Sequence, residues 1–241
     1  MKGLLAALAA MSLGTAAFGG LYEYKTTNPA ADGIDVSTAG GTVSSLDTTF
    51  NTSTKAFTWT VTFSDGVAKN TNGFWLVVSG GPNPKSTGGE YAIMYFDASS
   101  LSSPNVSIYE YNGVNGDNSF QTPAVELIST KTSGQSQISG VSASQSGASR
   151  TFAFNVDAST INSLQSTLGS AWQGIAFGSQ IGLWLHPVTG LTTTYSGAAL
   201  TAFNYQSEGY YDGANTPTVP VPATASLIAL GGLVAGRRRR A

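Results

Sequence analysis

Cysteine is absent from this sequence of 241 residues, histidine occurs once, and charged residues make up only 10% of the chain. The lack of cysteine excludes disulfide bonds, thiol catalysis and thiolate metal sites. Any serine–histidine–aspartate system would have to use His186, and no Gly-x-Ser-x-Gly segment is present to carry its nucleophile. We therefore predict no catalytic residue, and we place His186 at the end of a strand.

Apolar runs are short in this sequence, and the first of them is at the N-terminus. Lys2 is followed by the apolar segment Leu4–Leu13 and then by small residues such as Ala16 and Gly19. This order is typical of a secretory signal peptide, and the apolar segment is too short to span the ~30 Å hydrocarbon core of a membrane. We predict a signal peptide at residues 1–19.

Positive charge is scarce once the two ends of the chain are set aside. Five of the 11 basic residues are Lys2 and Arg237–Arg240, which leaves six against 13 acidic residues and a net charge of −7. No basic surface then remains to neutralise phosphates, so nucleic acid is not an expected partner. A body of about 200 residues can bury enough apolar surface to fold without disulfides.

The clearest strand is the segment Phe57–Phe63, in which aromatic and aliphatic residues alternate with threonine. This period of two predicts a half-buried antiparallel strand. Other predicted strands, bounded by turn residues, are at 42–50, 91–96, 106–111, 125–129, 150–156, 174–177, 182–186 and 191–195. The segment 74–78 is continuously apolar, as a central strand would be. Together they predict an all-β fold, an antiparallel β-sandwich of the jelly-roll or concanavalin-like type, in one domain at residues 20–216.

The predicted core of this domain is aromatic and aliphatic. Its members are Phe57, Trp59, Val61, Phe63, Trp75, Val77, Met94, Phe96 and Trp184. One short helix is predicted near residues 158–168, where Asp157 can cap the N-terminus and Gly169 the C-terminus. The apolar stripe of this helix consists of Ile161, Leu164 and Leu168.

The C-terminal segment, residues 217–241, combines three features in a fixed order. A proline pair in residues 219–222 comes first, an uncharged stretch at residues 223–236 follows, and four arginines nearly end the chain. The prolines favour an extended hinge outside regular structure. The uncharged stretch is short for a permanent transmembrane helix, and the arginines would keep its end in the cytoplasm. We predict a temporary membrane anchor.

In this order, the tail resembles the PEP-CTERM sorting signal. The residues that carry the resemblance are Val219, Pro220, Val221, Pro222, Arg237, Arg238, Arg239 and Arg240. Val221 stands where that family usually has glutamate. The resemblance implies a protein exported by bacteria that make exopolysaccharide, whose C-terminal segment is removed by an exosortase-type protease.

Two pairs of tyrosines share strand faces, Tyr91 with Tyr95 and Tyr109 with Tyr111. If these faces are exposed, the rings can stack on sugars, because each offers apolar area with a polar tip. The alternative is that they pack inside the domain, as aromatic residues commonly do. We predict these four tyrosines as glycan-binding candidates.

The segment Asn112–Asn118 is rich in oxygen ligands and in turn residues. Asn115, Asp117 and Asn118 could hold calcium together with backbone carbonyls. The spacing does not match an EF-hand loop, and asparagine and glycine are ordinary hairpin residues. A plain turn is therefore the preferred interpretation, and no cofactor is expected.

Glycoside hydrolysis would require two carboxyl groups about 5–9 Å apart. The carboxyl residues near predicted strands are Glu90, Asp97, Glu110 and Glu126, and they form no Glu-x-Asp-x-x-Glu set on one strand face. We predict a non-enzymatic protein of the cell surface or extracellular matrix that associates with polysaccharide. The alternatives are a carbohydrate-active enzyme on the same fold and a calcium-dependent adhesin. The expected processing partners are signal peptidase and the exosortase-type protease.

Overall fold

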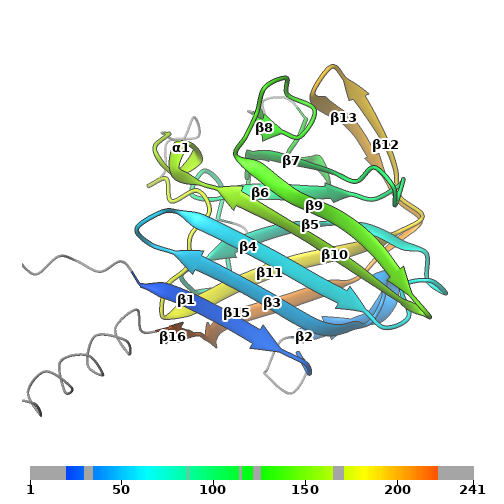
Figure 1. The fold of residues 1–241 in the computed structure, drawn as a ribbon, viewed down its shortest axis with the longest axis horizontal. Helices are drawn as coiled ribbons and strands as arrows, with labels where there is room; N and C mark the ends of the chain where they lie inside the picture. Colours follow the sequence, from blue (N-terminus) through cyan, green and yellow to red (C-terminus); the bar gives the residue numbers. More distant parts are fainter. Residues whose placement is uncertain are drawn as a thin grey trace, which may run out of the picture.

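The computed structural model describes residues 20–29, 35–85, 87–113, 116–121, 126–164 and 171–221. Two antiparallel β-sheets, a separate β-hairpin and one short α-helix make up this part of the chain (Figure 1). The prediction of an all-β protein with antiparallel pairing is confirmed. The predicted signal peptide and the uncharged stretch at residues 223–236 lie outside the described residues.

The smaller sheet contains six strands in the described part of the chain. In spatial order they are β16 (Val219–Val221), β1 (Leu21–Thr26), β3 (Val43–Asn51), β4 (Ala56–Phe63), β10 (Ser149–Asp157) and β9 (Ile138–Ser146).

The larger sheet packs against the smaller one and carries the more apolar strands. Its order is β2 (Asp35–Ser37), β15 (Tyr210–Pro217), β11 (Gln180–Thr189), β5 (Thr71–Ser79), β6 (Ala92–Asp97), β7 (Asn105–Glu110) and β8 (Glu126–Ser129). The short β14 (Ser207–Glu208) also pairs with β11, and β12 (Thr192–Ser196) forms the separate hairpin with β13 (Ala199–Asn204). Single 3-10 turns, η1 and η2, are at Thr38–Gly40 and Gly116–Asn118.

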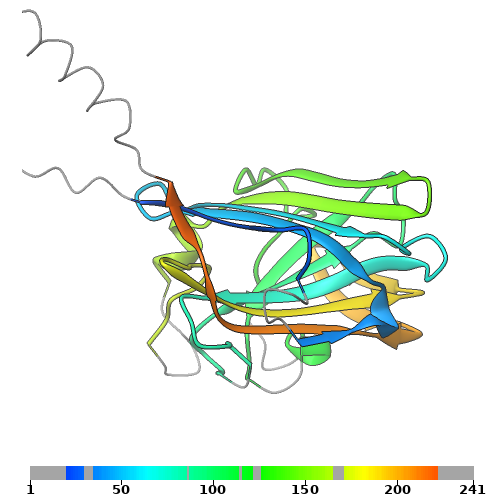
Figure 2. The same ribbon diagram turned by 90° about the horizontal axis from the view of Figure 1, so that it is seen from below.

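The facing sides of the two sheets share one hydrophobic core (Figure 2). The alternating pattern of β4 explains its place, since the four apolar side chains from Phe57 to Phe63 are all fully buried. The intervening threonines lie on the opposite, partly exposed face. Across the interface, the rings of Trp59 and Phe74 lie 6.5 Å apart. Apolar burial between the sheets is therefore the main source of stability.

The larger sheet is buried on both of its faces at β5. Phe74, Leu76 and Val78 point into the core between the sheets, whereas Trp75 and Val77 belong to a second apolar cluster on the outer face. All nine predicted core residues are buried, but Trp75, Val77 and Trp184 lie in this second cluster. The domain thus has two apolar layers where the sequence predicted one.

The helix is confirmed at Ser159–Asn162, but it is shorter than predicted. The Asn162 amide turns away from the helix and forms two hydrogen bonds, each 2.8 Å long, with the backbone of Ile175. Such side-chain bonds compete with helix continuation, and Leu164 is 41% exposed. The predicted positions Leu168 and Gly169 lie outside the described residues.

The segment 174–177, predicted as a strand, forms only one isolated bridge, between Gly174 and Tyr91. The proline-containing segment at the C-terminus also differs from its prediction. Val219–Val221 form β16 and pair with β1, with Pro220 opposite Tyr22. Proline lacks an N–H donor and is tolerated on an edge strand, which bonds on one side only. Pairing therefore continues past residue 216.

No helix within the described ranges is long and apolar enough to cross a membrane. Pro222 and the four arginines lie beyond the last described residue, Val221.

Replacing Phe63 with alanine should lower the free energy of unfolding by about 3–5 kcal/mol, because a fully buried ring would be lost. Its centroid lies 5.9 Å from that of Phe152. Thr60→Ala, on the other face of β4, serves as the control. Chemical unfolding of both variants measures the difference. A loss below ~0.5 kcal/mol for Phe63→Ala would mean that this face of β4 is not core.

Candidate functional site

The four tyrosines predicted to bind glycans are buried. Their exposed fractions are 5% for Tyr91, 1% for Tyr95, 2% for Tyr109 and 0% for Tyr111. Tyr95 donates a hydrogen bond to the carbonyl of Gly116, and the Tyr109 hydroxyl accepts one of 2.8 Å from the Leu200 N–H. The condition for glycan stacking, an exposed face, is therefore not met at these positions. We withdraw the prediction.

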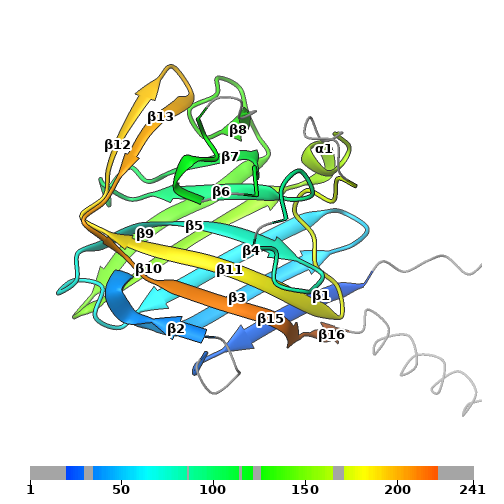
Figure 3. The ribbon, with the colours of Figure 1, turned by 180° about the vertical axis from the view of Figure 1, so that it is seen from behind.

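The hairpin β12–β13 lies beside β6 and β7 (Figure 3). Its Leu200 and Phe203 belong to the same outer apolar cluster as the four tyrosines, and the Phe203 and Tyr95 ring centroids are 5.3 Å apart. Asp97 of β6 anchors the hairpin, accepting hydrogen bonds from the hydroxyls of Thr193 (2.6 Å) and Tyr195 (3.0 Å). Burial and the nearby Asp97 raise the pKa of Tyr195, so this hydroxyl keeps its proton and remains a donor. Gly116 lies so close to Trp75 that any side chain there would collide with the indole.

The cover ends at a row of rings that runs across four neighbouring strands, from β6 to β15. We call Tyr210, His186, Trp75 and Tyr95 the aromatic row. His186 is opposite Trp75, and Trp75 is opposite Tyr95. The His186 imidazole stacks on the Trp75 indole, with ring centroids 4.8 Å apart and planes inclined by 15°, and it lies 6.2 Å from the Tyr210 ring.

Exposure increases along the aromatic row toward its β15 end. Trp75 is fully buried, the His186 side chain is 12% exposed, and Tyr210 is 43% exposed. His186 lies inside β11 rather than at the strand end predicted from the sequence. The sequence prediction missed Tyr210 as a site residue. Neighbouring side chains of a strand point to opposite faces, and this alternation in β15 could have identified Tyr210. The Tyr211 hydroxyl donates a hydrogen bond to the Gly41 carbonyl inside the domain, so Tyr210 faces outward.

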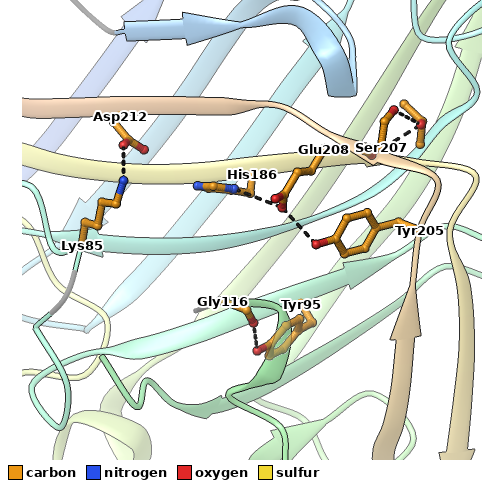
Figure 4. Close-up of polar contacts among 9 residues, drawn as sticks. Lys85, Tyr95, Gly116, His186, Tyr205, Ser207, Glu208 and Asp212 are labelled. Carbon is orange, nitrogen blue, oxygen red and sulfur yellow. Dashed lines mark hydrogen bonds and ion pairs between the residues drawn. The ribbon is translucent and has the colours of Figure 1, made fainter. Parts of the chain in front are cut away.

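Polar side chains from three segments border the open end of the row (Figure 4). We call Lys85, Tyr205, Glu208 and Asp212 the polar rim. The Nδ1 atom of His186 lies 3.5 Å from Oε2 of Glu208, which also accepts a hydrogen bond of 3.2 Å from the Tyr205 hydroxyl. The Lys85 ammonium lies 3.6 Å from an Asp212 carboxylate oxygen.

Glu208 is held in its charged form by these neighbours. The contact with His186 lowers the pKa of the Glu208 carboxyl below its ordinary value of 4.5; burial opposes this shift, and the bond from Tyr205 adds to it. Glu208 is therefore ionised at neutral pH and acts as a hydrogen-bond acceptor.

Several polar atoms beneath the rim have no hydrogen-bond partner among the described residues. They are the indole nitrogens of Trp75 and Trp184 and both ring nitrogens of His186, all buried. The 3.5 Å separation between His186 and Glu208 is too long for a good hydrogen bond. Unpaired buried polar groups are uncommon and costly in proteins, and this concentration marks the aromatic row as the candidate site.

The other predicted site residues do not converge here. Asn115 and the Asp117 side chain lie outside the described parts, and Asn118 accepts a hydrogen bond of 3.2 Å from Asn112. Within the described residues, no group of three or more histidine, cysteine or acidic side chains is placed to hold a metal. Asp97, a carboxylate candidate from the sequence, anchors the hairpin instead.

Comparison with known proteins returns no match to a protein-family model, to a curated protein or to a solved structure. Within the described residues, the candidate site consists of the aromatic row and the polar rim. Its chemistry is that of a surface offering ring faces, two carboxylates, one ammonium and buried N–H groups.

Proposed function

We propose that this protein is exported and binds polysaccharide at the cell surface or in the extracellular matrix, without catalysing a reaction. The observation that carries the proposal is the open end of the aromatic row, where Tyr210 is 43% exposed and its ring lies 6.2 Å from that of His186, the residue that contacts Glu208 of the polar rim. An aromatic ring provides apolar area for the C–H face of a sugar, and the rim provides partners for its hydroxyls.

The arrangement of the sheets is compatible with this function. Two antiparallel sheets that share a core support a β-sandwich of the jelly-roll or concanavalin-like type, as the sequence predicts. In that architecture, one sheet face presents the binding residues on rigid strands. The row follows this principle, because its members come from β15, β11, β5 and β6.

Glycoside hydrolysis is the second candidate, since Glu208 contacts His186, and Asp212 is paired with Trp184, two residues away from His186 on β11. That reaction needs one carboxyl group that stays protonated to act as the acid. The lowered pKa of Glu208 and the ion pair between Asp212 and Lys85 both favour charged carboxylates. These environments support binding over hydrolysis.

Replacing Tyr210 with alanine should weaken polysaccharide binding by about tenfold or more, since truncating an aromatic anchor of a binding surface commonly costs more than about 1 kcal/mol. The control is Leu164→Ala, which removes another large exposed apolar side chain, at 41% exposure. Affinity electrophoresis in gels containing extracellular polysaccharide measures both variants. Equal retardation of the two variants would rule out the row as the binding surface.

Export and removal of the tail form the second part of the proposal. They are supported by the order of proline pair, uncharged stretch and arginines at the C-terminus. A short apolar segment followed by positive charges suits retention in the membrane until a protease acts. Pairing of β16 with β1 adds a constraint, because a protease that needs Val219–Val221 extended and free must first separate this edge.

Mass spectrometry of the native extracellular protein tests the processing. We expect an N-terminus near Gly20 and a C-terminus near Pro222, with residues 223–241 missing. Replacing all four arginines with alanine should let unprocessed protein escape or mislocalise, because the stop-transfer charges are lost. An intact peptide covering residues 223–241 on the mature protein would contradict removal and leave a permanent anchor.

A further inference from the structure

We infer that the site selects neutral sugars and rejects uronic acids. This inference rests on the proposed polysaccharide binding and specifies its ligand class. The rim carries two carboxylates, Glu208 and Asp212, against one ammonium, Lys85. A sugar carboxylate placed on Tyr210 would therefore meet a surplus of negative charge.

The hydrogen-bonding capacity of the rim favours the same ligand class. An ionised carboxylate only accepts hydrogen bonds, whereas a hydroxyl both donates and accepts. Sugar hydroxyls can donate to Glu208 and Asp212 and accept from Lys85. In a uronate, an ionised carboxylate replaces the C6 hydroxymethyl group. Placing that carboxylate beside Glu208 or Asp212 brings two acceptors of like charge together, which is unfavourable.

Burial of the two carboxylates determines how strong this discrimination can be. The Asp212 side chain is only 13% exposed, and that of Glu208 is 39% exposed. Charges in partly buried positions are screened less by salt than those in full solvent. Selectivity should therefore persist at physiological ionic strength and decrease at high salt.

The surplus of acidic residues over the whole body could also repel an anionic polymer. A matched pair of variants separates this general effect from the rim. The first double variant, Glu208→Gln with Asp212→Asn, is called the rim variant. It removes two negative charges at the site and the ion pair between Asp212 and Lys85. Glu23→Gln with Asp47→Asn removes the same charge from the smaller sheet, where Asp47 pairs with Lys25 at 2.6 Å.

The experiment uses the full chain and two polyuronates, alginate and polygalacturonate, each compared with its own carboxyl-reduced neutral form. Binding is measured at about pH 8, above the range in which histidine ordinarily changes charge. The parent protein should bind the neutral form of at least one polymer about tenfold more tightly than the acidic form. The rim variant should reduce this ratio by about fivefold or more, as expected for like charges removed near a surface. The control variant should leave the ratio within about twofold.

Equal or tighter binding of the acidic forms by the parent protein would overturn the inference while leaving polysaccharide binding intact. An equal reduction of the ratio in the control variant would assign selectivity to overall charge and would also overturn it. Retention of neither form of either polymer would count against the proposed function itself, and the inference would fall with it. Thermal unfolding of both variants confirms that each remains folded.

Discussion

Burial of the larger sheet on both faces is the constraint on which the rest of the structure depends. At Phe74 and Trp75, consecutive side chains of β5 enter different apolar layers, and both are fully buried. The inner layer is covered by the smaller sheet and the outer one by the β12–β13 hairpin. On this outer face the exposed fraction rises from Trp75, which is fully buried, through the His186 side chain at 12% to Tyr210 at 43%. The candidate site lies where this outer apolar layer meets solvent, at Tyr210.

The cover is fixed by buried polar contacts as well as by apolar ones. Asp97 binds the hydroxyls of Thr193 and Tyr195, and the Asn72 side chain accepts from the Leu191 N–H at 2.7 Å and donates to the Leu191 carbonyl. Such bonds hold one arrangement of the hairpin, since breaking any of them would leave a buried group unpaired. A fixed cover in turn fixes where the aromatic row opens, and this gives the surface a defined shape in the absence of ligand.

The sequence predicts the layers better than it predicts the site. The alternation in β4 identifies its buried face, and the continuous apolar run around Trp75 is typical of a strand buried on both sides. The same reasoning could not locate the site, because alternation shows that Tyr109 and Tyr111 share a face but not that Leu200 of a later hairpin bonds to Tyr109 there. The row likewise depends on the register between strands far apart in the chain. The helix ended early because Asn162 bonds to Ile175, a contact that no local pattern indicates.

The proposed ligand site lies beside His186, and this residue offers a direct probe because it is the only histidine in the sequence. Protein labelled with ¹⁵N-histidine should therefore give a single set of imidazole signals. During titration with soluble polysaccharide fragments, these signals should shift and saturate together with the bound fraction, because the ring lies between Tyr210 and Trp75. Binding that saturates while the His186 signals remain unchanged would contradict the account and place the ligand elsewhere on the domain.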